Sequence, residues 1–512
     1  GTKGTVYEGQ LGLVDIDLDN NQAFNALMAM CDKTRKLRIR TNADSPVDAM
    51  KAVSFGAEGI GLFRTEHMFY GEGSDKPLFL LRKMIMSSTV EERKAALDEL
   101  AVFVKHDIKA TMEVLNGLPI TIRLLDPPLH EFVPHSEDKI EAMARELKID
   151  AAEVKRRGEA LKECNPMLGH RGVRLGVTYP EVSEMQIRSI LMAAGELIKD
   201  GKKAFPEIMI PVTCSANELT NQKKIVDRVY ADVCETLGVK KIPFMYGSMI
   251  EIPRAAITAQ SMAETAEFFS FGTNDLTQMG FGFSRDDIGG FLPEYIAQKI
   301  LPADPFQTID QDGIGELIKY GIDRGRLSRP QLKVGICGEH GGDPESVKFC
   351  HRVGMNYVSC SPFRVPIARL AAAQAVVEDK NSGNKLKTTA KEVKTMAKVT
   401  AKKATKPAAK KAAAKPVKKA AAKKIATKKA ATKKVAAKPM VKKATKKATK
   451  KAAPVAAKKR GRPAGSVKKA APVAKKAVKK AVKKATKPVA KKATKKAAPK
   501  ATAKKRGRPA KK

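Results

Sequence analysis

The sequence predicts an α/β fold, a (β/α)8 barrel, followed by a basic C-terminal segment. Eight short β-rich runs lie between residues 37 and 360 and alternate with helical patterns, as strands of a parallel sheet do. Eight strands are the number that closes such a barrel. Polar or ionisable residues follow five of the runs, at the strand ends where barrel active sites lie. On pattern alone, an open doubly wound sheet is the alternative.

The predicted strands share a length of five to eight residues and a content of apolar side chains. They are Leu37–Asn42, Glu58–Phe63, Ile120–Leu125, Glu207–Val212, Phe244–Glu251, Phe268–Gly272, Lys333–Cys337 and Met355–Cys360. Helical periodicity predicts helices over Val90–Leu115, Glu181–Asp200 and Asn217–Leu237. Ser88-Thr89, followed by two glutamates, is an N-terminal capping signal for the first of these. The weak run Gly169–Leu175 contains Arg and His, and we expect a loop there.

Two carboxylates at neighbouring strand ends, Glu251 and Asp275, form the first candidate site. Hard oxygen ligands of this kind suit Mg²⁺ or Mn²⁺, which take their other ligands from water and substrate oxygens. An ion pair or a helix cap is the alternative role for each residue.

Arg64 and Arg123 each follow apolar strand residues. The planar fork of an arginine in a barrel mouth fits a phosphate group; an internal ion pair with Glu66 or Asp126 is the alternative. Cys337 stands between glycine-containing turns, where a substrate can approach its thiol. A buried structural cysteine is the alternative there.

Together these residues indicate phosphoryl transfer on a small carboxylate that chelates a metal ion. The sequence contains neither a phosphate-binding P-loop motif nor a nucleophile elbow. No run is apolar for the roughly 18 residues of a membrane helix. The seven cysteines form no C-x-x-C pair, which favours free thiols and a cytoplasmic protein.

Six stretches resemble the C-terminal, phosphoenolpyruvate-binding domain of the pyruvate, phosphate dikinase family. They are 59–69 (GIGLFRTEHMF), 123–132 (RLLDPPLHEF), 165–172 (NPMLGHRG), 249–254 (MIEIPR), 271–278 (FGTNDLTQ) and 335–344 (GICGEHGGDP). Enzyme I of the sugar phosphotransferase system and phosphoenolpyruvate synthase share the barrel and the Gly-Thr-Asn-Asp-Leu-Thr-Gln signature. The stretch 125–132 (LDPPLHEF) favours the dikinase.

The resemblance assigns roles to matching positions. Arg64 and Arg123 would hold the phosphoryl group, Glu251 and Asp275 would bind Mg²⁺, and Cys337 would exchange a proton with the methylene carbon of phosphoenolpyruvate or pyruvate. The remaining substrate-binding positions would be Gly272, Thr273, Asn274, Asp275 and, as a weaker candidate, Arg285. The family also implies a homodimer and a phosphohistidine domain as the partner of the barrel.

The resemblance also divides the chain. Residues 1–10 resemble the end of the swivelling phosphohistidine domain, residues 11–378 form the barrel, and residues 379–395 form a polar linker. The family's nucleotide-binding domain and phosphohistidine motif are not recognisable, so we expect the sequence to be part of a longer enzyme.

Residues 396–512 hold 46 of the 97 Lys and Arg residues and none of the 54 Asp and Glu, which leaves 51 basic and 54 acidic residues before them. Such a segment without aromatic residues is predicted to be disordered alone and to bind a polyanion. It resembles lysine-rich histone H1-type tails. Two units resemble AT-hooks: Arg460-Gly461-Arg462-Pro463 and Arg506-Gly507-Arg508-Pro509.

The tail leaves a second hypothesis open. The protein could be a DNA-compacting protein, associated with the nucleoid, whose barrel is a passenger or was joined to the tail by a gene-model fusion. A solubilising or localising role for the basic run is the further alternative.

Overall fold

The eight predicted strands form a closed, all-parallel barrel in which each strand pairs with the next and β8 pairs with β1. The computed structural model describes residues 8–9, 20–70 and 73–381. The strands are β1 Arg38–Asn42, β2 Ile60–Arg64, β3 Pro119–Arg123, β4 Phe205–Ile210, β5 Met245–Ile250, β6 Phe268–Phe271, β7 Lys333–Ile336 and β8 Tyr357–Cys360. The closed topology confirms the barrel and excludes the open sheet.

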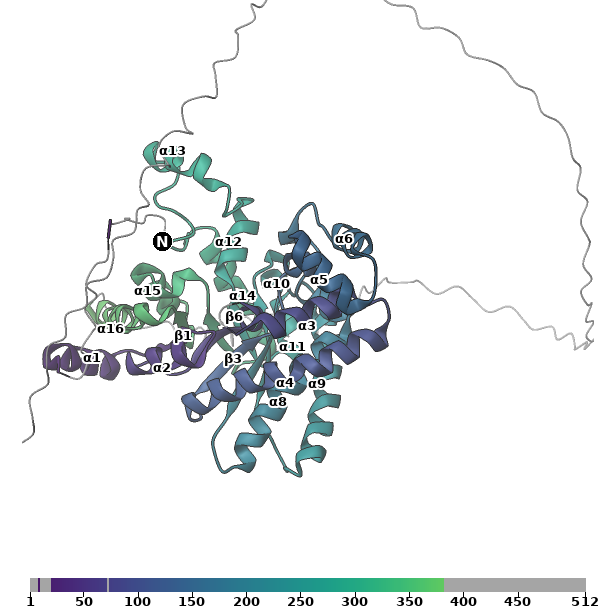
Figure 1. Cartoon of the computed structure of the whole chain (residues 1–512). Helices are drawn as coiled ribbons and strands as arrows, with labels where there is room; N and C mark the ends of the chain where they lie inside the picture. The colour runs from purple at the N-terminus through teal and green to yellow at the C-terminus, as the bar shows by residue number, and fades with distance from the viewer. Residues whose placement is uncertain (1–7, 10–19, 71–72, 382–512) are drawn as a thin grey trace, which may run out of the picture. The chain divides into compact units, whose positions relative to one another are not determined.

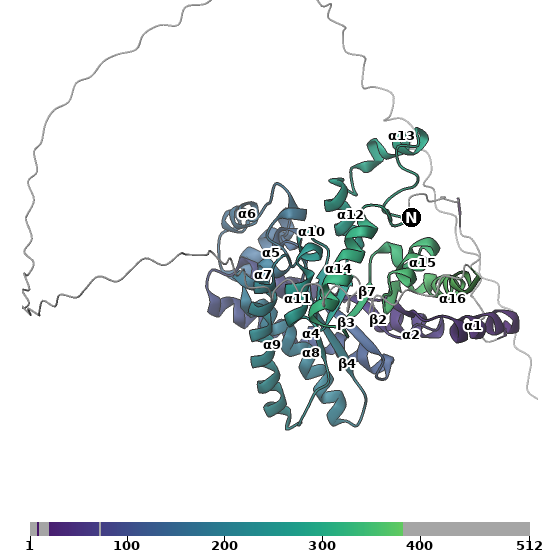
Figure 2. The same ribbon diagram turned by 180° about the vertical axis from the view of Figure 1, so that it is seen from behind.

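Helices surround the barrel (Figure 1). They are α1 Gln22–Thr34, α2 Pro46–Ser54, α3 Asp75–Met86, α4 Val90–Leu115, α5 Glu137–Leu147, α6 Ala151–Ala160, α7 Val173–Thr178, α8 Pro180–Lys199, α9 Ala216–Leu237, α10 Pro253–Ile257, α11 Ala259–Thr265, α12 Thr273–Phe281, α13 Leu292–Ala297, α14 Ile314–Ser328, α15 Pro344–Arg352 and α16 Val365–Asn381. The main core lies between these helices and the sheet, and α8 and α9 pack side by side in both views (Figure 2).

The predicted helices are confirmed within a residue or two at each end. The cap of α4 is a complete capping box, because Thr89 Oγ1 accepts from the Glu92 amide and the Glu92 carboxylate accepts from the Thr89 amide. The prediction for Gly169–Leu175 holds only in part. Residues 169–172 lie outside regular elements, whereas Val173–Leu175 begin α7, which Gly172 precedes with a φ of +57°.

The last helix corrects a predicted boundary. α16 continues to Asn381, so residues 379–381 of the predicted linker are helical. The rest of the linker, the tail 396–512 with both AT-hook-like units, and most of residues 1–10 lie outside the described residues. None of the described helices combines the length and the apolar character that a bilayer span requires.

A buried ionic cluster fills the barrel interior below the strand ends. Glu207 on β4 accepts hydrogen bonds from Arg40 on β1, at 2.8 and 3.2 Å, and pairs with Lys333 on β7. Thr121 Oγ1 donates to the same carboxylate at 2.8 Å, and the Arg40 guanidinium lies 4.2 Å from the centre of the Tyr357 ring. One carboxylate thus neutralises part of the charge of two buried cations, so removing Glu207 would leave both cations without their ion-pair partner.

Burial by itself would raise the pKa of Glu207, but Arg40 and Lys333 outweigh it and lower that pKa to about 2. Burial together with the nearby Arg40 lowers the pKa of Lys333 to about 8, although Glu207 acts in the opposite direction. The two shifts agree with a cluster in which cations outnumber the carboxylate.

Replacing Glu207 by Ala is expected to lower the free energy of unfolding by about 3–5 kcal/mol, because two buried cations lose their partner. The unfolded carboxyl has a pKa of 4.5 and the folded one about 2. The contribution of Glu207 is therefore complete above pH 4.5 and disappears as the pH falls toward 2. Denaturant titrations of wild type and variant at pH 7 and pH 3 check both statements. An equal difference in stability at the two pH values would contradict the second.

Candidate active site

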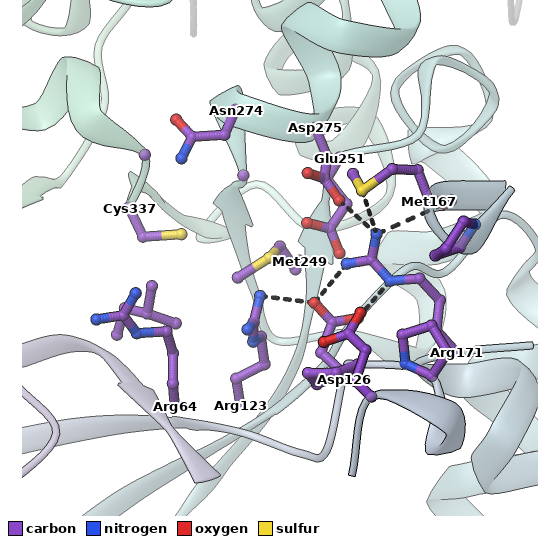
Figure 3. Close-up of a pocket in the computed structure, with 17 residues that line it drawn as sticks. Arg64, Arg123, Asp126, Met167, Arg171, Met249, Glu251, Asn274, Asp275 and Cys337 are labelled. Carbon is purple, nitrogen blue, oxygen red and sulfur yellow. Dashed lines mark hydrogen bonds and ion pairs between the residues drawn. The ribbon is translucent and has the colours of Figure 1, made fainter. Parts of the chain in front are cut away.

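A cavity of about 280 Å³ opens where the strands end at the carboxyl face of the barrel. Figure 3 shows its side chains pointing toward one another from opposite sides of the barrel. The lining residues are Leu62, Arg64, Arg123, Asp126, Pro127, Pro128, Glu131, Pro166, Met167, Arg171, Met249, Glu251, Gly272, Asn274, Asp275, Cys337 and Gly338. Its volume suits a small metabolite, since pockets for drug-sized ligands measure about 300–1,000 Å³.

Arg64 and Arg123 are the last residues of β2 and β3, and both reach the cavity as predicted. Asp44 fixes Arg64: its Oδ1 accepts from the Arg64 amide at 2.9 Å, and its Oδ2 accepts from Nε at 3.1 Å. Burial alone would raise the pKa of Asp44, but His67 and Arg64 outweigh it and lower that pKa to about 2. Asp44 therefore stays ionised and holds the guanidinium in place.

Arg123 forms the internal ion pairs that the sequence suggested as its alternative role, with both Glu66 and Asp126. Its Nη2 donates to Glu66, and its Nη1 lies 2.8 Å from Asp126 Oδ2. The Nε of Arg123 is buried and makes no hydrogen bond among the described residues. Since a guanidinium has five N–H donors, these ion pairs orient Arg123 and still leave a donor for an anion.

Arg171 joins this group to the carboxylate side of the cavity. It donates to Asp126 through Nε at 3.1 Å and through Nη2 at 2.6 Å, and its Nη1 lies 3.1 Å from Asp275 Oδ2. Figure 3 shows the guanidinium between the two carboxylates. Burial by itself would raise the pKa of Asp126, but Arg123 and Arg171 outweigh it and lower that pKa.

Glu251 follows β5 and lies beside Asp275, which belongs to the first turn of α12 (Figure 3). Burial and the neighbouring Asp275 raise the pKa of Glu251 to about 8. Burial also raises the pKa of Asp275, although Arg171 and Arg123 act in the opposite direction. The structure thus holds two carboxylates close together in a site that disfavours their charges.

Two backbone features hold Glu251. Val212, after β4, has a φ of +56°, a conformation that costs a β-branched residue about 1–3 kcal/mol. Its amide donates to Glu251 Oε1 at 2.6 Å. A Cβ on Gly272 would stand 2.7 Å from Glu251 Oε2, so a larger residue there would displace the carboxylate. The strained backbone at Val212 places a hydrogen-bond donor on the Glu251 carboxylate, and the absence of a side chain at Gly272 leaves space for it.

Cys337 follows β7, and its thiol points into the cavity opposite Glu251 and Asp275 (Figure 3). Burial raises the pKa of this thiol to about 11, with a smaller opposing effect from a hydrogen bond of Ser270. The thiol is therefore protonated at neutral pH and can donate a proton.

A family model for the PEP-utilising enzyme, PEP-binding domain, matches residues 19–377. This chain belongs to the PEP-utilising enzymes. Among its curated relatives is the pyruvate, phosphate dikinase of Clostridium symbiosum, 52% identical over 381 residues, which are 74% of this chain and 43% of the relative. Pyruvate, phosphate dikinase 1, chloroplastic, of Oryza sativa subsp. japonica is 51% identical over 383 residues, 74% of this chain and 40% of the relative.

The chloroplastic pyruvate, phosphate dikinase of Flaveria trinervia is 51% identical over 381 residues, 74% of this chain and 39% of the relative. The chain thus spans about two fifths of the length of these relatives. The PEP-binding domain of the family coincides with the barrel.

The donor set of this PEP-utilising enzyme fits a divalent cation. Asp275 Oδ2 is buried without a hydrogen bond of regular geometry, although it forms the ion pair with Arg171. Among the residues that the structure describes, no three His, Cys, Asp or Glu side chains form a metal-binding group. Mg²⁺ commonly binds through one or two carboxylates and takes its remaining ligands from water and substrate. Glu251 and Asp275 would be those two carboxylates.

Two of the residues predicted to bind substrate are not among those that line the cavity. The Thr273 side chain does not line the cavity, because it is buried against His340 at 2.7 Å. Arg285 is exposed and pairs with Glu339 outside the cavity lining. Gly272, Asn274 and Asp275 do line the cavity, as predicted.

Three residues contribute to the site but were not predicted from the sequence: Arg171, Asp44 and Val212. Asp126 was predicted only as a possible partner of Arg123. Arg171 stands in the stretch 165–172 that resembles the dikinase family, and this signal could have identified it. No local signal marks Val212, because its role depends on a backbone conformation and on a side chain 39 residues away.

Proposed function

We propose that the barrel binds phosphoenolpyruvate and pyruvate and carries the pyruvate half of a pyruvate, phosphate dikinase. The complete reaction would be ATP + pyruvate + phosphate = AMP + phosphoenolpyruvate + diphosphate. The observation that supports this proposal is the meeting of three arginines, the carboxylate pair Glu251 and Asp275, and one protonated thiol in a single small cavity. The named relatives, which are pyruvate, phosphate dikinases, point to the same activity.

In this proposal, Arg64 and Arg123 hold the phosphoryl group. Both are oriented in advance by carboxylates, so binding an anion requires no search for the side-chain conformation. Arg171 would stabilise the same region of negative charge from the other side of Asp126.

Glu251 and Asp275 would hold Mg²⁺, which supplies positive charge to stabilise the developing enolate and to orient the substrate. Asn274 would accompany these carboxylates at the substrate, since it lines the same cavity.

The proton comes from Cys337. As the bond between phosphorus and the enol oxygen of phosphoenolpyruvate breaks, its electron pair remains on the oxygen and gives the enolate of pyruvate. The thiol of Cys337 then gives its proton to the methylene carbon and becomes a thiolate. The phosphoryl group would pass to a histidine of a separate phosphohistidine domain, the proposed partner of this site.

Oxalate, a planar mimic of the enolate, tests the site without any partner domain. We expect the full chain to bind oxalate in the presence of Mg²⁺ and to lose that binding when EDTA removes the metal. Isothermal titration calorimetry measures both. Equal affinity with and without metal would remove the metal from the proposal.

We also propose a homodimer formed through the barrel. Large apolar side chains are exposed on neighbouring elements: Met30 on α1, Val47 and Met50 on α2, Phe363 in the 3₁₀ turn Pro362–Arg364, and Ile367 on α16. Since α2 contacts that turn and α1 contacts α16, these side chains support a shared surface.

A second candidate function rests on the sequence of the tail. We propose that residues 396–512 bind duplex DNA, because they carry 46 positive and no negative side chains. Affinity should fall with a log–log salt slope steeper than about −5. The two Arg-Gly-Arg-Pro units should add a preference for A·T over G·C, since minor-groove contacts distinguish little else.

Fluorescence titrations of A·T-rich and G·C-rich duplexes at several salt concentrations test the tail. Changing Arg462 and Arg508 to Ala should remove the A·T preference and keep most of the salt-dependent affinity. A flat salt response would remove the nucleic-acid function.

A further inference from the structure

His340 is a fully buried histidine that the proposed chemistry does not use. It lies in the 3₁₀ turn Glu339–Gly342, three residues after Cys337. Its Nδ1 lies 2.7 Å from Thr273 Oγ1, and its Nε2 lies 2.9 Å from the carbonyl oxygen of Pro305. Both ring nitrogens are therefore engaged, each with a different segment of the fold.

These two contacts fix the tautomer of the ring. A carbonyl oxygen only accepts, so Nε2 carries the hydrogen and donates to Pro305. Burial lowers the pKa of His340, which keeps the ring neutral, and the unprotonated Nδ1 then accepts from the Thr273 hydroxyl. The only proton of that hydroxyl is thus committed to His340.

Thr273 is the first residue of α12, directly before Asn274 and Asp275. The turn that follows Cys337 packs tightly against it: a Cβ on Gly338 would stand 2.0 Å from Thr273 Oγ1. The Glu339 amide also donates to Asn274 Oδ1 at 3.2 Å. The bond between His340 and Thr273 is a buried side-chain connection between the segment with the thiol and the segment with the metal carboxylate. It adds to the backbone hydrogen bond of 3.1 Å that the Cys337 amide donates to the Phe271 carbonyl oxygen.

Pro305 belongs to the excursion 282–313 between α12 and α14. This excursion has its own apolar cluster, built around Ile288, Leu292 and Phe306, and α13 within it projects away from the barrel (Figures 1 and 2). Its hydrogen bond to His340 holds the ring from the side opposite Thr273.

We propose that His340 is a positioning residue that aligns the Cys337 turn with the first turn of α12 through the Thr273 hydroxyl. This inference rests on the proposed function, because it assigns His340 to the alignment of the thiol with the enolate. Proton transfer requires that alignment, whereas binding depends on the arginines and carboxylates, which His340 does not touch.

Two replacements of His340 by amide side chains each keep one of the two hydrogen bonds of the ring and remove the other. In His340→Asn, the side-chain amide stands near the position of Nδ1 and can still accept from Thr273. In His340→Gln, the amide stands near the position of Nε2 and can still donate to Pro305. We expect His340→Gln to slow the exchange of pyruvate methyl protons with D₂O by about tenfold, which equals about 1.4 kcal/mol in the barrier.

His340→Asn should keep the exchange rate within about threefold of wild type, a difference of less than about 1 kcal/mol. The measurement is proton NMR of pyruvate with the full chain, Mg²⁺ and phosphate. Calorimetric affinity for oxalate with Mg²⁺ should stay near the wild-type value in both variants, which separates alignment from binding. Wild-type exchange in His340→Gln, or equal loss in both variants, would overturn the proposal.

Thr273→Val provides a second test should the His340 variants fail to fold. It removes the hydroxyl with little change of shape, and it should slow exchange as much as His340→Gln without an additional loss in the double variant. Additive losses would overturn the proposal. Absence of exchange and of oxalate binding in the wild-type chain would instead contradict the proposed function itself.

Discussion

Replacing Cys337 by Ala is expected to reduce the exchange of pyruvate methyl protons by about 10²–10⁴-fold, the usual contribution of a positioned general acid or base. The thiol lines the cavity opposite the carboxylates, and burial keeps it protonated by raising its pKa to about 11. Alanine removes the only cysteine thiol that lines the cavity. Deuterium incorporation followed by NMR, with Mg²⁺ and phosphate present, measures the loss.

Affinity for oxalate should change little in the same variant, because no contact of Cys337 among the described residues holds the arginines proposed to bind the phosphoryl group or the carboxylates proposed to bind the metal. Cys350→Ala is the matched control: Cys350 is equally buried, but it lies on α15 outside the cavity lining. The control should lower thermal stability and leave exchange intact. Wild-type exchange in Cys337→Ala would return this residue to a structural role.

Replacing Asp275 by Ala is expected to weaken the Mg²⁺-dependent binding of oxalate by more than about 100-fold, the upper end of the effect of residues that only support metal ligands. Glu251 would remain as the single carboxylate at the proposed metal position. Arg171 would lose one of its two anionic partners and would keep Asp126. Calorimetry at fixed pH with saturating Mg²⁺ measures the effect.

Asp286→Ala is the control for this variant, since Asp286 is an exposed carboxylate in the excursion after α12 and does not line the cavity. It should bind oxalate like the wild type. Undiminished metal-dependent binding in Asp275→Ala would remove Asp275 from the metal site, and the ion pair with Arg171 would then be its role.

Local patterns were sufficient for the predicted elements of the fold. The eight strands follow from short apolar runs, and α4 follows from its periodicity together with the capping signal at Thr89 and Glu92. Boundaries differ by at most two residues, as for β5, which covers Met245–Ile250 instead of Phe244–Glu251. A strand ends at its last backbone hydrogen bond to a neighbouring strand, and the hydropathy of the sequence does not identify that residue.

The same local logic predicted four residues that line the cavity. Arg64, Arg123, Glu251 and Cys337 occupy the end of a strand or the position directly after it. Because all strands of a barrel point the same way, their ends meet at one face, and position along the chain was enough to bring these residues together.

The sequence by itself determined the alternation of strands and helices and the segregation of positive charge into residues 396–512, and it predicted a barrel with a site at the carboxyl face. The tertiary structure alone decided which charges meet. Arg171 bridges Asp126 and Asp275, and Glu207 joins Arg40 and Lys333, across separations of 45 to 167 residues. It also turned Thr273 toward His340 and away from the cavity. Periodicity along a chain specifies which face a residue takes within its own element, whereas ion pairs and buried hydrogen bonds depend on which elements the closed sheet places opposite one another.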